Sequence, residues 1–380
     1  MGFEIICKDK RKGSKARAGI LKTKSGDVET PFFMPVATKS GVKHIGIDDL
    51  ESMNASAVIS NAFVLFLSPG PEILKKAGGI GNFMKWKGIN FTDSGGFQMY
   101  TKSIYLGSQE EGVWFKNPKN GDKFFVSPEY DMKIQLDIGS DVAMCLDSMP
   151  LYGEKKESIK EACRKTAYWA RKCKLEHDNL QKGLDEKKRQ LLFGICQGGI
   201  HQDLREESAK EISEIDFDGY ALGGLALGEP KKDEYKMIEA VKKYFPEEKP
   251  VYLMGAGNPL ELLESISRGV DMFDSRFPTK NARRGTLFTS KGILRVTNSK
   301  FKEDFSPIDS ECDCWVCKQH SKAYVRHLLM EKEGWGYRMA SYHNLYFLQN
   351  LMRDARKAII DGTFDKLLEK FRKYYEGYGD

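Results

Sequence analysis

Short apolar runs recur along the first three quarters of the chain, and each is rich in β-branched or aromatic residues. Eight such runs occupy residues 32–37, 57–63, 89–94, 141–147, 191–197, 219–225, 251–257 and 270–275. Amphipathic stretches separate several of them, for example "SIKEACRKTAYWARKCKLEH" and "DEYKMIEAVKKYF". Nearly continuous apolar runs between such stretches are typical of strands that are buried on both faces of a parallel sheet.

Eight units of this kind predict an α/β fold, an irregular (β/α)8 TIM barrel. A doubly wound open sheet is the alternative, because the sequence does not show whether the sheet closes. Residues 97–135 interrupt the rhythm, and "KNPKNGDKFFVSPEY" within them is expected to form a hairpin followed by a turn. We therefore expect a single catalytic domain over residues 1–380, with a cysteine-containing subdomain at residues 298–350 and a helical tail at residues 344–380.

Length and composition narrow the protein class. A chain of 380 residues buries a large core and needs no disulfides for stability. The basic N-terminal segment contains no apolar stretch of signal-peptide length, and no later segment approaches the ~18 apolar residues of a membrane-spanning helix. The sequence thus predicts a soluble cytoplasmic protein with no membrane partner, in which clustered cysteines favour metal or redox chemistry over structural bridges.

Positive charge is concentrated in one part of the chain. The net charge is +6, and residues 276–326 contain eleven Lys or Arg against five Asp or Glu. Four of these cations, Arg276, Lys280, Arg283 and Arg284, come directly after the eighth apolar run. A solvated surface loop is one interpretation, but four cations in nine residues exceed what one small phosphate requires. The density favours a polyanion such as RNA.

Polar residues and glycines stand at the carboxyl ends of the predicted strands, where barrel enzymes place their chemistry. Asp93 and Asp274 end two of the runs and could divide nucleophile and acid/base roles, as carboxylate pairs do at glycosidic bonds. Asp147 and Gln197 would complement the edge of a guanine-type base. Helix caps and Asx turns are the structural alternative for strand-end aspartates.

Three cysteines lie within six positions of the segment "ECDCWVC", at Cys312, Cys314 and Cys317. A redox pair has no use for a third cysteine, whereas three thiolates can hold one zinc ion and leave a single coordination position. The candidates for that position are His320, His327 and His343. A closed site of this type would be structural.

The motifs "FTDSGGFQ", "GICQGG", "YALGGLALGE", "LMGAG", "GVDMFDSRFPTKNARRG" and "ECDCWVC" together resemble those of the bacterial tRNA-guanine transglycosylases, in order over residues 15–360. The resemblance implies exchange of guanine at the wobble position of tRNAs with G-U-N anticodons for a 7-deazaguanine base. It also implies a (β/α)8 barrel, one structural Zn2+ per subunit and a homodimer. The family's zinc spacing selects His343 as the fourth ligand.

The same resemblance implies roles for individual residues. Asp274 matches the nucleophile that forms a covalent RNA intermediate, and Asp93 matches the general acid and base. The expected base contacts are Ser94, Phe97, Asp147, Gln197, Gly224, Leu225, Met254 and Glu229. The expected RNA contacts are Arg276, Lys280, Arg283 and Arg284.

Two questions stay open at this stage. Ser148 and Met149 replace an acid and a cysteine that bacterial members carry, so the changed pocket wall leaves queuine as a candidate base, while Leu227, larger than the glycine of eukaryotic relatives, favours the aminomethyl base. A non-catalytic tRNA-binding partner of the same fold is the alternative function, although it would be expected to lack Asp93 or Asp274. A zinc hydrolase would need His-x-His at the strand ends, and none of the six histidines lies in the eight runs.

Overall fold

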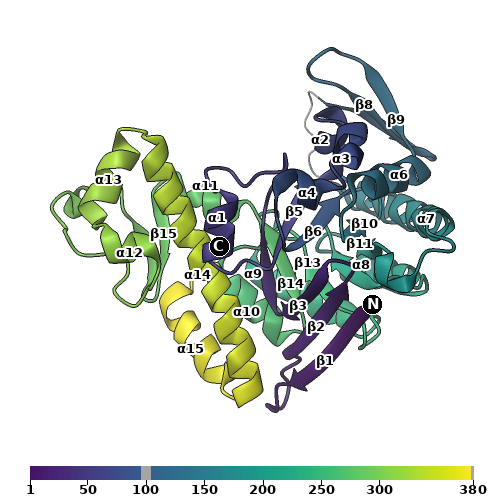
Figure 1. The fold of residues 1–380 in the computed structure, drawn as a ribbon. Helices are drawn as coiled ribbons and strands as arrows, with labels where there is room; N and C mark the ends of the chain where they lie inside the picture. The colour runs from purple at the N-terminus through teal and green to yellow at the C-terminus, as the bar shows by residue number, and fades with distance from the viewer. Residues whose placement is uncertain (96–103, 378–380) are drawn as a thin grey trace.

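The structure is a computed structural model, and it describes residues 1–95 and 104–377. Its centre is a parallel sheet of eight strands (Figure 1): β4 (Phe32–Pro35), β5 (Ala57–Asn61), β6 (Ile89–Asp93), β10 (Val142–Met144), β11 (Leu191–Cys196), β12 (Gly219–Leu222), β13 (Val251–Leu253) and β14 (Met272–Ser275). Each strand lies within one of the eight predicted runs. All six residues of β11 are buried, as expected of a strand covered on both faces.

The order of the strands shows a barrel. It runs β4-β14-β13-β12-β11-β10-β6-β5, so each strand pairs with its neighbour in the series and β14 returns to β4. The two edge strands, β4 and β5, approach each other through a parallel bridge between Val36 and Ile59. The sheet is therefore a nearly closed barrel. The prediction of a (β/α)8 fold is confirmed, and the doubly wound open sheet is wrong.

Helices surround this barrel (Figure 1). They are α1 (Ile47–Ser52), α2 (Ala62–Leu67), α3 (Pro71–Lys76), α4 (Ile80–Met84), α6 (Pro128–Ile138), α7 (Lys156–Leu180), α8 (Gln202–Ser213), α9 (Lys231–Lys242), α10 (Pro259–Ser267) and α11 (Phe277–Ala282), with a 3-10 turn η1 (Glu186–Lys188). The long helix α7 shows why they pack as they do. Ala162, Thr166, Trp169 and Cys173 recur at helical spacing and are buried, while Arg164 and Arg171 between them are exposed.

Two antiparallel sheets are added to the barrel. The first consists of β1 (Gly2–Lys8), β2 (Arg17–Thr23) and β3 (Gly26–Thr30), and the second of β7 (Tyr105–Gln109), β8 (Gly112–Lys116) and β9 (Lys123–Val126). The predicted hairpin corresponds to β8 and β9. The first sheet is tied to the barrel by a buried ion pair, in which Arg17 Nη2 lies 2.6 Å from Asp271 Oδ2.

The C-terminal quarter forms a unit beside the barrel (Figure 1). It contains β15 (Thr286–Thr289), β16 (Gly292–Arg295), η2 (Ser299–Phe301), α12 (Trp315–Gln319), α13 (Lys322–Met330), α14 (Gly334–Asp361) and α15 (Phe364–Tyr375). Helix α14 connects the unit to the barrel, because Gln349 Nε2 donates to the Phe33 carbonyl of β4 (3.0 Å). No helix in the described part of the chain is both long and apolar enough to span a bilayer.

Candidate active site and metal centre

The carboxyl ends of the barrel strands surround a cavity of about 380 Å³. Most of the predicted site residues line it: Asp93, Ser94, Asp147, Gly224, Leu225, Met254, Asp274, Arg276 and Lys280. They come from five different strand ends and from the start of α11, so only the closed sheet brings them together. Met149 and Leu227, the two positions that bear on the choice of base, also line this cavity.

Asp274 ends β14, and its side chain is fixed from one side. The Tyr252 hydroxyl donates to Asp274 Oδ1 at 2.5 Å, and the Gly255 N–H donates to the same oxygen at 3.0 Å. Burial raises the pKa of Asp274 above its usual range, and the two hydrogen bonds oppose this. Because both donors bind Oδ1, the second oxygen, Oδ2, is left without a donor in the described part of the chain.

Asp93 ends β6 and shares the cavity with Asp274. Its Oδ1 accepts hydrogen bonds from Asn61 Nδ2 (2.7 Å) and from the Gly95 N–H (2.8 Å). Burial, followed by the negative charge of Asp274, raises the pKa of Asp93 to about 8. Asp93 therefore carries a proton at neutral pH. Two carboxyl groups at one cavity, one of which has its pKa raised by the charge of the other, suit acid/base chemistry combined with nucleophilic attack.

Asp147 and Gln197 form a buried pair at one wall of the cavity. Gln197 Nε2 donates to Asp147 Oδ2 at 2.6 Å, and the Ser94 hydroxyl donates to Asp147 Oδ1 at 3.4 Å. Burial raises the pKa of Asp147 to about 6, against the effect of these two donors. Gly224 has a φ of 66° and lies so close that a Cβ there would come within 2.5 Å of Gln197 Oε1. Only glycine fits this conformation and space.

Three predicted base contacts need separate comment. Glu229 is buried, and its carboxylate accepts the N–H groups of Ala226 (2.5 Å) and Leu227 (2.9 Å). Glu229 lines a second cavity, of about 530 Å³, and does not line the cavity that contains Asp93 and Asp274. Gln197 lies behind the cavity wall, next to Gly223 and Gly224. Phe97 is outside the described residues.

The predicted RNA-binding cations surround the start of α11. Arg276 and Lys280 are exposed at the mouth of the cavity, and Arg284 is exposed one turn further on. Arg283 is half-buried, and its pKa is lowered by burial and by the charges of Arg276 and Arg284. Its Nη1 has no hydrogen-bond partner within the described part of the chain. The positive charges of these four residues are therefore not balanced by negative charges around them among the residues that the structure describes.

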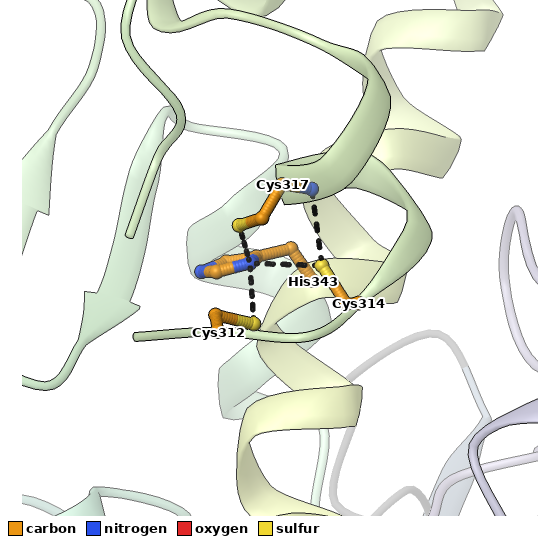
Figure 2. Close-up of side chains that lie close together, drawn as sticks. All are labelled: Cys312, Cys314, Cys317 and His343. Carbon is orange, nitrogen blue, oxygen red and sulfur yellow. Dashed lines mark hydrogen bonds between the residues drawn. The ribbon is translucent and has the colours of Figure 1, made fainter. Parts of the chain in front are cut away.

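The three cysteines converge on His343 of α14 (Figure 2). The Sγ atoms of Cys312, Cys314 and Cys317 lie 3.8, 3.5 and 3.4 Å from His343 Nδ1. Zinc bonds of roughly 2.3 Å to sulfur and 2.0–2.1 Å to nitrogen at a tetrahedral angle would separate these atoms by roughly 3.6 Å. His343 Nε2 lies 2.7 Å from the Phe288 carbonyl, which orients Nδ1 toward the thiols. The cluster thus fits one tetrahedral metal ion.

Of the three candidate histidines, the structure selects His343. His320 packs against Trp315 and Trp335, with ring centroids 5.8 and 6.5 Å away, and His327 is exposed on α13. The residues that the structure describes contain one cluster of His, Cys, Asp and Glu side chains that could hold a metal ion, and it is this one.

Comparison with known proteins agrees with this site. A family model described as queuine tRNA-ribosyltransferase matches residues 11–377. The chain belongs to this family. Two proteins named queuine tRNA-ribosyltransferase, from Staphylococcus aureus strains bovine RF122 / ET3-1 and JH9, are each 45% identical to it over 368 residues, which is 97% of this chain and 94% of theirs. The chain is therefore an enzyme of the pentosyltransferase class.

Two residues at this queuine tRNA-ribosyltransferase site escaped the sequence analysis. Tyr252 stands inside the apolar run of β13 and resembles an ordinary core aromatic, although its hydroxyl binds Asp274. Arg205 lies in the charged segment "DLREES" of α8, which is typical of a solvated helix, yet its side chain is fully buried behind Gln197 and Gly224. The sequence does not indicate that Arg205 is buried, because its hydrogen-bond partners are backbone carbonyls, which every residue carries.

Proposed function

We propose that this enzyme exchanges guanine at the wobble position of tRNAs with G-U-N anticodons for a 7-deazaguanine base. The observation that carries the proposal is the pair Asp274 and Asp93, which face one cavity and of which Asp93 has its pKa raised further by the charge of Asp274. Base exchange at a single ribose carbon needs a nucleophile and a proton carrier on either side of one glycosidic bond. The 7-aminomethyl base and queuine are both candidates for the incoming base.

The first half of the reaction forms a covalent intermediate. Oδ2 of Asp274 attacks C1′ of the ribose while the C1′–N9 bond breaks and its electron pair passes to guanine. Asp93, protonated at neutral pH, gives its proton to the departing base. The product is an ester between Asp274 and the ribose, with the configuration at C1′ inverted.

The second half reverses these roles. Asp93, now ionised, removes the proton from N9 of the incoming base, which attacks C1′. The C1′–O bond breaks and its electron pair returns to Asp274 as a carboxylate. Two inversions at one carbon restore the original β configuration, and the proton given up in the first half is recovered in the second.

The wall of the cavity would read the base. The Asp147 carboxylate suits the two N–H groups of a guanine edge, since a carboxylate accepts two parallel hydrogen bonds. Gln197 uses one amide hydrogen on Asp147 and has a second to offer the base carbonyl, together with the N–H of Gly224. Ser94 donates to Asp147, and Leu225, Met254 and Phe97 would enclose the ring. Glu229 would act from outside the cavity, since its carboxylate holds the Ala226–Leu227 backbone that lines it.

The basic residues at the cavity mouth would hold the RNA. We assign anticodon-loop contacts to Arg276, Lys280, Arg283 and Arg284, because mutual repulsion among these cations is relieved when phosphates approach. The metal that best suits three thiolates and one imidazole is Zn2+, which would crosslink the cysteine segment to α14 and have no part in catalysis. A cytoplasmic homodimer, one subunit catalysing and the other helping to hold the tRNA, stays a prediction.

The test is the covalent intermediate. Asp274→Ala should abolish the denaturant-stable adduct between the protein and a tRNA with a G-U-N anticodon, detected by gel electrophoresis. Asp216→Ala, a change at an exposed aspartate that pairs with Lys249, is the matched control and should leave the adduct intact. An adduct that persists in Asp274→Ala would refute the nucleophile assignment.

The alternative function, a non-catalytic tRNA-binding partner, is tested in the same samples. Such a protein would bind tRNA without incorporating labelled guanine. The presence of both Asp93 and Asp274 at the cavity disfavours it. Competition between the aminomethyl base and queuine for one tRNA would then decide which base is preferred.

A further inference from the structure

Arg205 of α8 is a fully buried guanidinium that has no carboxylate partner among the residues the structure describes. Its nitrogens donate only to backbone carbonyls: Nη1 to Cys196 (3.1 Å) and Gly223 (2.8 Å), and Nη2 to Gly199 (2.8 Å). Nε makes a longer contact with the Gly199 carbonyl at 3.2 Å. Burial of an unpaired charge is costly, so stability alone gives little reason to place an arginine here.

The carbonyls that Arg205 binds belong to the segments that carry Gln197 and Gly224. A trans peptide unit points its C=O and N–H in opposite directions. Since the Gly223 carbonyl points at Arg205, the N–H of the same peptide unit, which belongs to Gly224, points away from Arg205. Gly223 and Gly224 line the cavity, and the Gly224 N–H meets no acceptor within the described part of the chain.

Helix α8 also holds the neighbouring strand end. The backbone N–H of Gln197 donates to the Ser208 hydroxyl at 3.0 Å, and Arg205 binds the carbonyl of the same Cys196–Gln197 peptide unit. A Cβ on Gly198 would come within 2.7 Å of the Arg205 backbone, so the helix and the strand end are in close contact. One helix thus fixes the orientation of two peptide units behind the proposed base-reading wall.

We propose that Arg205 is a positioning residue for recognition of the base carbonyl, an inference that rests on the proposed function. Its guanidinium orients the Gly223–Gly224 peptide unit and polarises it, so that the Gly224 N–H becomes a stronger donor toward the 6-carbonyl oxygen of the bound purine. Hydrogen bonds in such chains strengthen one another, and a charged donor at the far end increases the effect. Arg205 does not line the cavity and touches no substrate.

This arrangement would matter for the reaction as well as for binding. When the C1′–N9 bond breaks, part of the electron pair that guanine receives is delocalised onto its carbonyl oxygen. A preorganised N–H donor at that oxygen stabilises the developing charge and needs no reorganisation at the moment of reaction. Arg205 would therefore act on the base carbonyl through the backbone.

The experiment compares two purines in Arg205→Met. Guanine carries the 6-carbonyl and an N1 hydrogen, and 2-aminopurine lacks both but keeps the 2-amino group that would face Asp147. The affinity of the variant for each purine is therefore compared with that of the wild-type protein for the same purine. Guanine binding is measured by inhibition of labelled guanine incorporation, and 2-aminopurine binding by its own fluorescence with concentrated protein. We expect guanine to bind about tenfold more weakly, because the donor remains but loses its polarising partner, whereas 2-aminopurine affinity stays within about twofold of wild type.

Arg356→Met is the matched control. Arg356 also binds two backbone carbonyls, those of Gly19 (2.8 Å) and Thr30 (2.7 Å), but it does so at the N-terminal sheet. Its loss should lower thermal stability without changing the ratio of the two purine affinities. The affinity for tRNA should be unchanged in both variants.

If Arg205→Met lowers the affinities for guanine and 2-aminopurine by the same factor, Arg205 has a structural role only and the proposal is overturned. Unchanged affinities for both purines would also overturn it. If Arg205→Met does not fold, Arg205→Lys carries the test. A lysine ammonium group cannot bind the three carbonyls in the arrangement that the guanidinium does. In Arg205→Lys the affinity for guanine should therefore still fall about threefold relative to the affinity for 2-aminopurine. A wild-type protein that incorporates no guanine into tRNA would refute the proposed function and not the role of Arg205.

Discussion

The hydrogen bond from Tyr252 to Asp274 should set the acid limit of the pH range in which the enzyme works. Tyr252 is fully buried in β13, and its hydroxyl lies 2.5 Å from Asp274 Oδ1. Burial and the charge of Asp274 raise the pKa of Tyr252 well above its usual range, so the hydroxyl stays a donor. Tyr252→Phe removes this donor and leaves the shape of the strand unchanged.

The size of the effect follows from the charge on the acceptor. A hydrogen bond to a charged group contributes about 1.5–3 kcal/mol. One pKa unit corresponds to about 1.36 kcal/mol of difference between protonation states, so losing the bond should raise the pKa of Asp274 by about one to two units. Burial already raises that pKa, and Tyr252 opposes the rise; its removal therefore adds to the shift.

This shift has a defined consequence for activity. In the proposed mechanism the first step needs Asp274 ionised and Asp93 protonated, so the enzyme should be active between the pKa of Asp274 and that of Asp93, about 8. In Tyr252→Phe the lower limit should rise by about one to two pH units while the upper limit stays near 8. The active range becomes narrower from the acid side.

The assay is kcat/KM for guanine exchange measured across the pH range that brackets both limits. Tyr220→Phe is the matched control, because Tyr220 is a buried tyrosine on the adjacent strand β12 whose hydroxyl donates to the Ile215 carbonyl (3.0 Å). It should leave both limits unchanged. If Tyr252→Phe lowers the rate equally at every pH, the hydrogen bond does not control the ionisation of Asp274 and the reasoning fails.

Three further predictions concern the metal, the RNA and the fold. Cys317→Ser should lose bound zinc and lower the thermal unfolding temperature, measured by metal analysis and calorimetry, because one thiolate of the tetrahedral set is gone; full zinc content in the variant would contradict the ligand set. Lys280→Met should reduce the slope of log affinity for tRNA against log salt by about 1, measured by filter binding, and an unchanged slope would exclude a phosphate contact. Arg17→Met should cost about 3–5 kcal/mol of unfolding free energy in urea titrations, since it leaves Asp271 buried and unpaired; a cost below about 1 kcal/mol would show that the pair is dispensable.

Much of the barrel could be predicted from the chain because strands covered on both faces need nearly continuous apolar sequence. Each of the eight runs contains one strand of the sheet. The sheet β1–β2–β3 was not predicted, because β1 and β3 alternate between more and less exposed positions and contain no continuous apolar run. Helix α14 begins at Gly334, ahead of the helical tail expected from residue 344, and its first turn packs through Gly336 against Leu328 of α13.

Some residues of the candidate site could also be predicted from the sequence, and others could not. Asp93, Asp147 and Asp274 could be recognised in the sequence because each directly follows an apolar run, and the carboxyl ends of parallel strands meet at one edge. Their partners Asn61 and Gly95 also lie near strand ends. Tyr252 and Arg205 could not be recognised, because one resembles core and the other resembles a solvated helix.

The amino-acid sequence by itself indicated the eight strands of the barrel sheet, the strand-end aspartates and the close spacing of Cys312, Cys314 and Cys317. These features can be recognised in the sequence because they depend on residues that are close together in the chain and on apolar runs that recur along it. The family's zinc spacing already pointed to His343, and the tertiary structure brings it to the cysteines. Only the tertiary structure decided that Tyr252 binds Asp274 and that Arg205 supports the Gly223–Gly224 peptide. Those contacts join different elements, and they exist only when the barrel has brought the strand ends and α14 into place.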